Sequence, residues 1–274
     1  MIISELNRKD INLAYKKVKS YLYYSNNTTL YKLRFAEFEK RKNLLGSTLQ
    51  VLRNGTDSEE WKNLLEKIRY YSLPKKFKTE PESKKRIFIF NTENIDEPLE
   101  VDSIFYYIDC PVEIHIISML WTIKRGVYLD KDLDSFIYGN RLFHTEQKND
   151  SLQTFEKYYI KYTEWRDKAI ENSLLLHSQK RSSCILSLDF KDYYHSIDLN
   201  EKLFSSIESS SYNFLDKFIF SISSSYSKLF GKENKILPIG LTSSNILANY
   251  YLKDIDYAFQ NKFTPFYYGR YVDD

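Results

Sequence analysis

Apolar residues near the N-terminus recur at the spacing of an amphipathic helix. Residues 11–22 place Ile, Ala, Tyr, Val and Leu side chains on one helical face, and Asp10 precedes them as an N-cap. A second helix is predicted to begin at residues 57–61, and a third to follow Pro111 and cover residues 112–123. The first seventy residues are therefore predicted to be mainly helical.

A polar region separates the second and third of these helices. Residues 73–86 carry six cations and two anions, which predicts a solvated loop. Such a loop matters for function only if other motifs require a phosphate-binding surface. Residues 86–90 form a short β-type run, and residues 91–101 are acidic and predicted to form a loop.

Two short apolar runs in the second half end in carboxylates. Residues 184–190 are predicted to form a buried strand that brings Asp189 to the edge of a sheet. Residues 265–272 are predicted to form a strand that ends in Asp273 and Asp274. Between them, the sequence predicts a helix start at 198–201, a turn at 237–240 and a helix at 246–258.

These carboxylates suit phosphoryl transfer. Joining a 3′-hydroxyl to a nucleotide uses two divalent cations roughly 4 Å apart. Mg²⁺ prefers oxygen ligands and is held by a few carboxylates plus substrate phosphates. Three acids at one sheet edge would repel each other without a cation. A site for Mg²⁺ or Mn²⁺ is therefore expected at Asp189, Asp273 and Asp274, provided that the two strands pair in space.

Composition limits the classes of protein that fit. Aromatic residues make up 16% of the chain, which suits stacking on nucleobases, although codon bias explains most of the 24 tyrosines. The net charge of +3 is too small to argue for nucleic acid by itself. The two cysteines, Cys110 and Cys184, have neither metal-site nor disulfide-framework spacing. With no signal-peptide or membrane-spanning run in the sequence, a cytoplasmic protein with no membrane contact is expected.

Four segments carry a family resemblance. Leu-Asp-Phe-Lys-Asp-Tyr-Tyr-His-Ser-Ile at 188–197 resembles the first catalytic motif of reverse transcriptases. Leu-Pro-Ile-Gly-Leu-Thr-Ser-Ser-Asn-Ile-Leu-Ala-Asn-Tyr-Tyr-Leu at 237–252 is similar to their nucleotide-binding turn and helix, and Tyr-Gly-Arg-Tyr-Val-Asp-Asp at 268–274 to their second catalytic motif. Phe-Ile-Tyr-Gly-Asn-Arg-Leu at 136–142 resembles their fingers motif. The resemblance is strongest to bacterial abortive-infection and defence-associated members.

This resemblance implies an α+β fold, namely a fragment of a right-hand polymerase. Residues 1–180 are expected to be the N-terminal helical region and fingers, and residues 181–274 a partial, ferredoxin-like palm. The thumb is expected to be absent, because the chain stops within the turn of the second catalytic motif. The chain is accordingly expected to be a fragment or a natural truncation that does not polymerise by itself.

The resemblance also implies residue roles. Asp189 and Asp273 match the paired metal ligands, with Asp274 as the supporting carboxylate. The carbonyl of Phe190 is expected to complete a metal shell, and Tyr194 to floor the sugar pocket and exclude a ribose 2′-hydroxyl. The other expected contacts are Asp192, Gly240, Arg141, Lys85 and Arg86 for the nucleotide, and Ser244 and Asn249 for the primer-template.

The function that follows is RNA-directed DNA polymerisation in antiphage defence, with an RNA template, a DNA product and deoxynucleoside triphosphates. Untemplated or protein-primed synthesis, a non-coding RNA or protein partner, and oligomerisation all remain open. One alternative is a non-catalytic RNA-binding or assembly module that keeps the palm shape. Another is a cyclic-nucleotide synthase, which would not account for the turn at 237–240.

Overall fold

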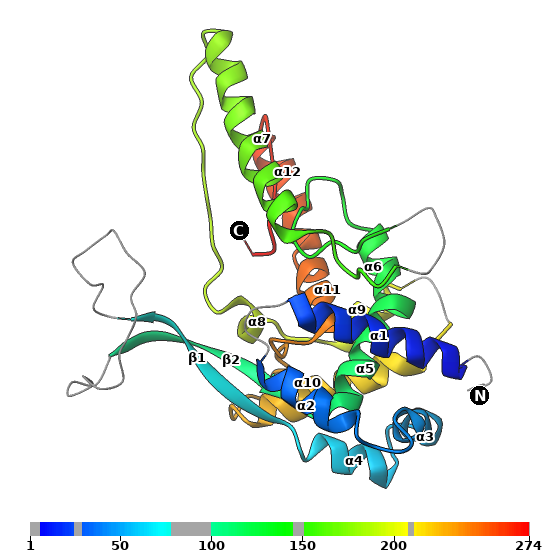
Figure 1. The fold of residues 1–274 in the computed structure, drawn as a ribbon. Helices are drawn as coiled ribbons and strands as arrows, with labels where there is room; N and C mark the ends of the chain where they lie inside the picture. The colour runs from blue at the N-terminus through cyan, green and yellow to red at the C-terminus, as the bar shows by residue number, and fades with distance from the viewer. Residues whose placement is uncertain (1–5, 25–28, 78–99, 145–150, 208–210, 274) are drawn as a thin grey trace.

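The computed structural model describes residues 6–24, 29–77, 100–144, 151–207 and 211–273. Within these ranges the chain is mainly helical and contains one two-stranded sheet, which confirms the α+β class (Figure 1). The elements in chain order are α1 (Arg8–Tyr24), α2 (Thr29–Phe38), α3 (Gly46–Asn54), α4 (Glu59–Leu65), β1 (Arg69–Phe77), β2 (Val101–Asp109), α5 (Val112–Trp121), the π-helix η3 (Thr122–Gly126), α6 (Val127–Lys131), α7 (Tyr158–Ser178), α8 (Tyr193–Ser196), α9 (Glu201–Ser205), α10 (Phe214–Lys228), α11 (Thr242–Tyr251) and α12 (Lys253–Phe263).

The predicted N-terminal helices are confirmed. The apolar face of α1 is buried at Ile11, Ala14 and Val18. The helix predicted near residue 57 is α4, whose N-cap is Ser58; its side chain accepts a hydrogen bond from the backbone of Trp61. Helices of this length are barely stable in isolation. They are stabilised when their apolar faces pack against a shared partner.

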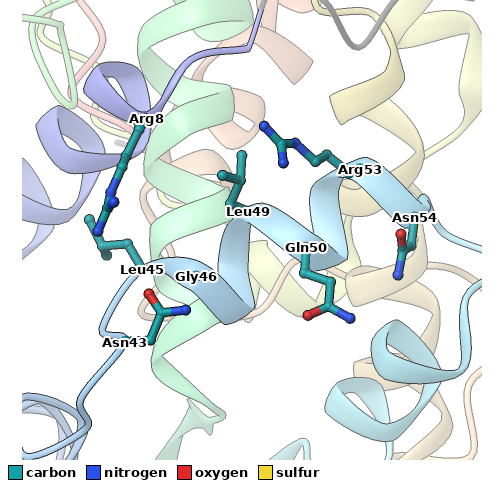
Figure 2. A pocket seen from close by; sticks show the side chains of 8 residues that line it. All are labelled: Arg8, Asn43, Leu45, Gly46, Leu49, Gln50, Arg53 and Asn54. Carbon is teal, nitrogen blue, oxygen red and sulfur yellow. The ribbon is translucent and has the colours of Figure 1, made fainter.

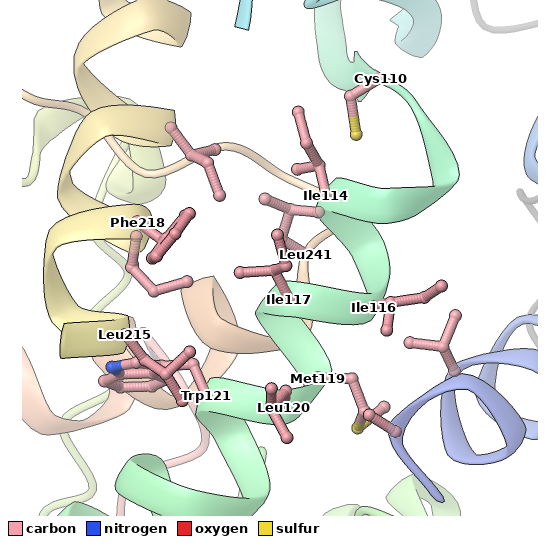
Figure 3. Packing of buried hydrophobic residues seen from close by; sticks show 14 of the residues in the cluster. Cys110, Ile114, Ile116, Ile117, Met119, Leu120, Trp121, Leu215, Phe218 and Leu241 are labelled. Carbon is pink, nitrogen blue, oxygen red and sulfur yellow. The ribbon is translucent and has the colours of Figure 1, made fainter. Parts of the chain in front are cut away.

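That partner is α5, which is buried along its whole length. Figure 3 shows Ile117 on the side of α5 that meets Phe218 of α10, and Met119 on the side that faces α1. A helix that is buried on every face belongs in the centre of a domain. The helix predicted after Pro111 is therefore the central element around which the others pack.

The basic run predicted as a loop is partly a strand, so that prediction is wrong for residues 73–77. These residues lie in β1, which pairs antiparallel with β2. Cross-strand aromatic pairs outweigh the charge pattern, because Tyr71 stacks on Tyr107 with ring centroids 5.5 Å apart and Tyr70 meets Tyr106 at 5.3 Å. The β-type run predicted at 86–90 and most of the loop predicted at 91–101 lie outside the described residues.

The two strands predicted in the second half do not form. Residues 184–190 are extended but exposed, with Leu186 at 67% and Leu188 at 54%. Residues 265–272 make one isolated bridge, between Ile137 and Arg270. A short apolar run becomes a buried strand only where neighbouring strands supply hydrogen bonds and cover, and the described chain brings no sheet to either run.

Smaller differences concern helix ends. Asp198 does not cap α9, because the side chain of Asn200 accepts the hydrogen bond from the Leu203 backbone N–H and takes the N-cap position. The helix predicted at 246–258 is two helices, α11 and α12, which meet at Leu252. The apolar spacing continues through this break, so the pattern alone predicts a single helix.

The helix α7 extends away from the other helices, and residues 179–190 run back from its far end to α8 (Figure 1). Only Leu176 of α7 is buried. The main buried cluster includes residues from both sides of position 180, from Leu6 to Leu252. Because this cluster spans position 180, the predicted division into fingers (1–180) and palm (181–274) stays a prediction. None of the helices described is both long and apolar enough to cross a membrane.

Candidate active site

The two segments that carry the predicted catalytic carboxylates meet in space. The backbone N–H of Phe190 donates a hydrogen bond of 3.3 Å to the backbone carbonyl of Asp273. This bond joins positions more than eighty residues apart, and it makes Asp189 a neighbour of the Asp273 turn. Asp189 is exposed and Asp273 is partly exposed, so solvent and a substrate have access to this place.

Oxygen donors at this place are of the kind that a magnesium ion prefers. Asp189 and Asp273 both supply carboxylates, which are hard ligands suited to Mg²⁺ or Mn²⁺. The third predicted ligand, Asp274, lies outside the described residues. Among the residues whose positions are described, no three acidic, histidine or cysteine side chains are grouped closely enough to hold a metal ion. The donor set therefore fits in chemical type, and its completion depends on Asp274.

Tyr194 stands beside these carboxylates in a hydrogen-bonded network. Its hydroxyl donates to Asn245 Oδ1 at 3.1 Å and accepts from Asn140 Nδ2 at 3.3 Å. The amide of Asn245 then donates to the hydroxyl of Tyr21 at 3.2 Å. Burial, and after it the nearby Tyr21 and Asp273, raise the pKa of Tyr194. The ring is consequently neutral and is held in place by residues from three separate segments.

Arg270 fixes the chain that leads into the Asp273 turn. Its guanidinium is buried and forms a fork with Asp256, with Nε 2.8 Å from Oδ1 and Nη2 2.9 Å from Oδ2. The same guanidinium donates to Asn249 Oδ1 at 2.9 Å and to the Val272 carbonyl at 2.6 Å. Arg270 therefore ties the residue just before Asp273 to α11 and α12 at once.

Residues 136–142 pack directly against the segment that leads into the Asp273 turn. Tyr138 N–H donates to the Arg270 carbonyl at 2.9 Å, and Arg270 N–H donates to the Phe136 carbonyl at 3.0 Å. A Cβ atom on Gly139 would lie 2.7 Å from the backbone nitrogen of Val272, so a residue without a side chain is needed. Val272 itself has a φ of 61°, a strained value for a β-branched residue and one that recurs at functional sites.

Comparison with known sequences agrees with this geometry. The family model described as reverse transcriptase (RNA-dependent DNA polymerase) matches residues 129–274, which is more than half of the chain. The chain belongs to the reverse transcriptase family. No curated protein and no solved structure matches it. The matched region contains the three segments that meet at Phe190, Gly139 and Arg270.

Arg141, predicted to contact the nucleotide, is engaged within the protein in this reverse transcriptase. Its Nε donates to Asp130 Oδ1 at 3.0 Å, and its other N–H groups donate to the carbonyls of Asp130, Leu133, Asp134 and Ile137. A guanidinium has five N–H groups, and these bonds use all five. Arg141 therefore holds the turn after α6, and its contact with a triphosphate stays a prediction.

Ser244 and Asn249 are not surface residues that face a primer-template. Both are buried, at 1% and 0% exposure. Asn249 donates to the Gly139 carbonyl at 2.8 Å while it accepts from Arg270, so it connects two of the matched motifs. Helical spacing places both residues on α11 but does not say which face of the helix the rest of the fold covers.

Gly240 lies where a side chain would not fit, and its approach to a nucleotide stays a prediction. Its φ is 110°, and a Cβ atom there would lie 2.3 Å from the hydroxyl of Tyr31. That hydroxyl donates to the Ile108 carbonyl at 2.6 Å. The missing side chain therefore makes room for a buried tyrosine that joins α2 to β2.

For the remaining residues that were predicted to contact the nucleotide, the structure gives less information. Asp192 is exposed in the left-handed conformation at the start of α8, with a φ of 50°. Lys85 and Arg86 lie outside the described residues. Sequence reasoning missed Asn140, Asn245 and Arg270. Arg270 lies within the quoted second catalytic motif, so its position was a usable signal, whereas no pattern pointed to its partner Asp256.

A hollow of about 470 Å³ lies elsewhere, between the start of α1 and α3 (Figure 2). Arg8 and Arg53 extend toward it, and Asn43 and Gln50 line it. None of the predicted catalytic, nucleotide or primer-template residues whose positions are described belongs to its walls.

Proposed function

We propose that this chain carries the catalytic carboxylates of an RNA-directed DNA polymerase that adds deoxynucleotides with Mg²⁺ or Mn²⁺. Residues 1–180 would form the helical region and fingers, and residues 181–274 part of a right-hand palm. The observation that carries the proposal is the hydrogen bond between Phe190 and Asp273, which brings the two matched catalytic motifs together.

In the proposed reaction, the 3′-oxygen of a primer attacks the α-phosphorus of a deoxynucleoside triphosphate. The bond from that phosphorus to the pyrophosphate breaks, and pyrophosphate leaves. Asp189, Asp273 and Asp274 would hold two divalent cations, with the Phe190 carbonyl as a further oxygen ligand. When bound, such cations stabilise the attacking and leaving oxygens.

Tyr194 would select the sugar. Its ring is fixed by Asn140 and Asn245, so it cannot move aside for a bulkier substituent without breaking both hydrogen bonds. A ribose 2′-hydroxyl would collide with such a ring, whereas a deoxyribose would not. Asp192, exposed at the start of α8, would lie near the triphosphate.

The biological setting that we propose is bacterial antiphage defence. Support comes from the sequence tokens Leu-Pro-Ile-Gly at 237–240 and Tyr-Gly-Asn-Arg-Leu at 138–142, together with Ser244 followed by Asn245. The template would be RNA and the product DNA, and untemplated or protein-primed synthesis remains part of the proposal.

The test is Asp189→Asn in the natural polypeptide that carries this chain. Deoxynucleotide incorporation should fall more than about 100-fold, because even outer-shell partners of metal ligands are worth about 10–100-fold. Asp254→Asn, an exposed aspartate on α12, is the matched control and should leave the rate unchanged. A rate for Asp189→Asn close to that of the control would refute the assignment.

A second candidate is a non-catalytic assembly module, which the exposed apolar surface of the chain favours. Leu174 on α7 is 63% exposed, and Ile185 and Leu186 in the returning segment are 62% and 67% exposed. Apolar surface of this kind is typical of interaction sites. The two candidates separate in a phage-protection assay, since an assembly module would protect equally well with Asp189→Asn.

A further inference from the structure

A cavity of about 840 Å³ lies next to the candidate active site. Its walls come from α1, from residues 138–140, from residues 152–157, from the start of α7 and from Tyr271. The volume falls within the range of about 300–1,000 Å³ that is usual for ligand sites. Tyr271 lies two positions before Asp273, so one wall of the cavity belongs to the turn that carries a predicted catalytic carboxylate.

Tyrosines form much of the wall of this cavity, which we call the tyrosine cavity. They are Tyr21, Tyr24, Tyr138, Tyr158, Tyr159 and Tyr271. Three of these rings are largely exposed, with Tyr24 at 81%, Tyr158 at 73% and Tyr159 at 54%. Exposed rings around a cavity are surfaces on which nucleobases stack, and such stacking tolerates any base sequence.

Charge on the wall suits a phosphate backbone. Lys157 and Lys161 line the cavity together with a single acid, Glu156. Lys161 also pairs with Glu164 at 3.0 Å, whereas Lys157 is exposed and has no ion pair with any residue that the structure describes. Lysine contacts to phosphate are independent of sequence, as expected for a strand that passes through.

The wall of the cavity is shared with the Tyr194 network. Asn140 lines the cavity and donates to the Tyr194 hydroxyl, and Tyr21 lines it and accepts from Asn245. The ring proposed to select the sugar therefore lies directly behind this wall. A strand that occupies the cavity would therefore contact Asn140, which donates to the Tyr194 hydroxyl, and Tyr271, which precedes the Asp273 turn.

We propose that the tyrosine cavity binds an unpaired stretch of a single-stranded nucleic acid, with bases stacked on the exposed tyrosines and phosphates on Lys157 and Lys161. This inference rests on the proposed function, because a polymerase is what would bring such a strand to the cavity. Stacking and phosphate contacts themselves need neither a metal ion nor catalysis, so they can be tested separately from the reaction.

The first experiment locates the strand. A single-stranded oligonucleotide that contains 5-iodouracil is irradiated with the protein in the absence of divalent cations, and the attached peptides are identified by mass spectrometry. Attachment at Tyr24, Tyr158 or Tyr159 is the expected result. Attachment to β1, where Lys75 and Lys76 lie, in place of these tyrosines would overturn the proposal.

The second experiment measures affinity for the same single strand by fluorescence anisotropy. Tyr159→Leu should weaken binding about tenfold, in line with the value of one base stacked on an aromatic ring. Tyr158→Leu should act in the same direction. Tyr128→Leu on α6 is the matched control, because Tyr128 is 41% exposed and does not line the cavity. A duplex of equal length should bind equally to all three variants.

Equal single-strand affinity of Tyr159→Leu, Tyr158→Leu and Tyr128→Leu would overturn the proposal, and unchanged circular dichroism spectra would show that all three fold. Single-strand affinity and deoxynucleotide incorporation separate this inference from the proposed function, and Asp189→Asn should lower incorporation while it leaves the affinity unchanged. If the tyrosine variants bind the single strand as tightly as the wild type, and the wild type incorporates deoxynucleotides, the cavity proposal alone is refuted. If the tyrosine variants bind more weakly, and the wild type incorporates no deoxynucleotides, the polymerase proposal alone is refuted.

Discussion

Replacing Arg270 by methionine is expected to destabilise the folded reverse transcriptase by about 3–5 kcal/mol, because it leaves a buried carboxylate without its partner. Arg270 and Asp256 have side-chain exposures of 4% and 1%, so neither group is solvated. Methionine keeps much of the apolar stem but none of the five N–H groups.

The magnitude follows from what remains around Asp256. Among the residues that the structure describes, the hydroxyl of Tyr268, at 2.7 Å, is the one donor that would remain on its carboxylate. Asn249 Oδ1 and the carbonyls of Asn249 and Val272 would each lose the donor that Arg270 supplies. Each buried polar group without a partner costs about 1–3 kcal/mol, and a charged one costs more.

The assay is urea denaturation followed by tryptophan fluorescence, with midpoints and slopes compared between variants. Arg166→Met is the matched control, since Arg166 and Asp167 form an exposed pair of 2.7 Å. An exposed ion pair is worth at most about 1 kcal/mol, so this control should change stability little. Adding Asp256→Leu to Arg270→Met removes the stranded charge and should recover part of the loss.

A destabilisation by Arg270→Met no larger than that by Arg166→Met would refute the reasoning. So would a failure of Asp256→Leu to recover any stability in the double variant. Either result would mean that water reaches Asp256 once Arg270 is removed, and that the fork does not hold the turn before Asp273.

Two further predictions concern His115 and Tyr194. Burial lowers the pKa of His115 from its ordinary value of 6.5 to about 4, so its contribution to stability is complete above about pH 6.5 and is lost as the pH falls toward 4, by about 3 kcal/mol. Denaturation across this pH range should show a weaker acid dependence for His115→Leu than for the wild type or for His177→Gln, a change at an exposed histidine; equal slopes would contradict this. Tyr194→Val should raise ribonucleotide incorporation relative to deoxynucleotide incorporation by at least about tenfold, whereas Tyr193→Phe, which keeps a ring, should not; an unchanged ratio would show that Tyr194 does not contact the sugar.

Much of the helical scaffold follows from local patterns. The apolar face of α1 and the mainly apolar α5 were both predictable, because a buried helix leaves its spacing and its starting residues in the sequence. The family could also be recognised from the segments around Asp189 and Asp273, since these residue types in this order suit one kind of chemistry.

The strands and their pairing partners could not be predicted in this way, because strand pairing depends on residues far away in the chain. Residues 184–190 have the composition of a buried strand and are exposed, whereas residues 73–77 have the charge of a loop and pair with β2. A strand exists only where a second segment supplies its hydrogen bonds.

The same dependence decides where the side chains of the predicted site residues lie. Arg141 and Asn249 have side chains that could contact a nucleic acid, but tertiary structure directs them to Asp130 and Arg270 instead. The sequence by itself determined the family and the order of its motifs along the chain. Only the tertiary structure decided which polar side chains are engaged inside the protein, because an N–H group that donates to Asp130 or to a backbone carbonyl is no longer free for another acceptor.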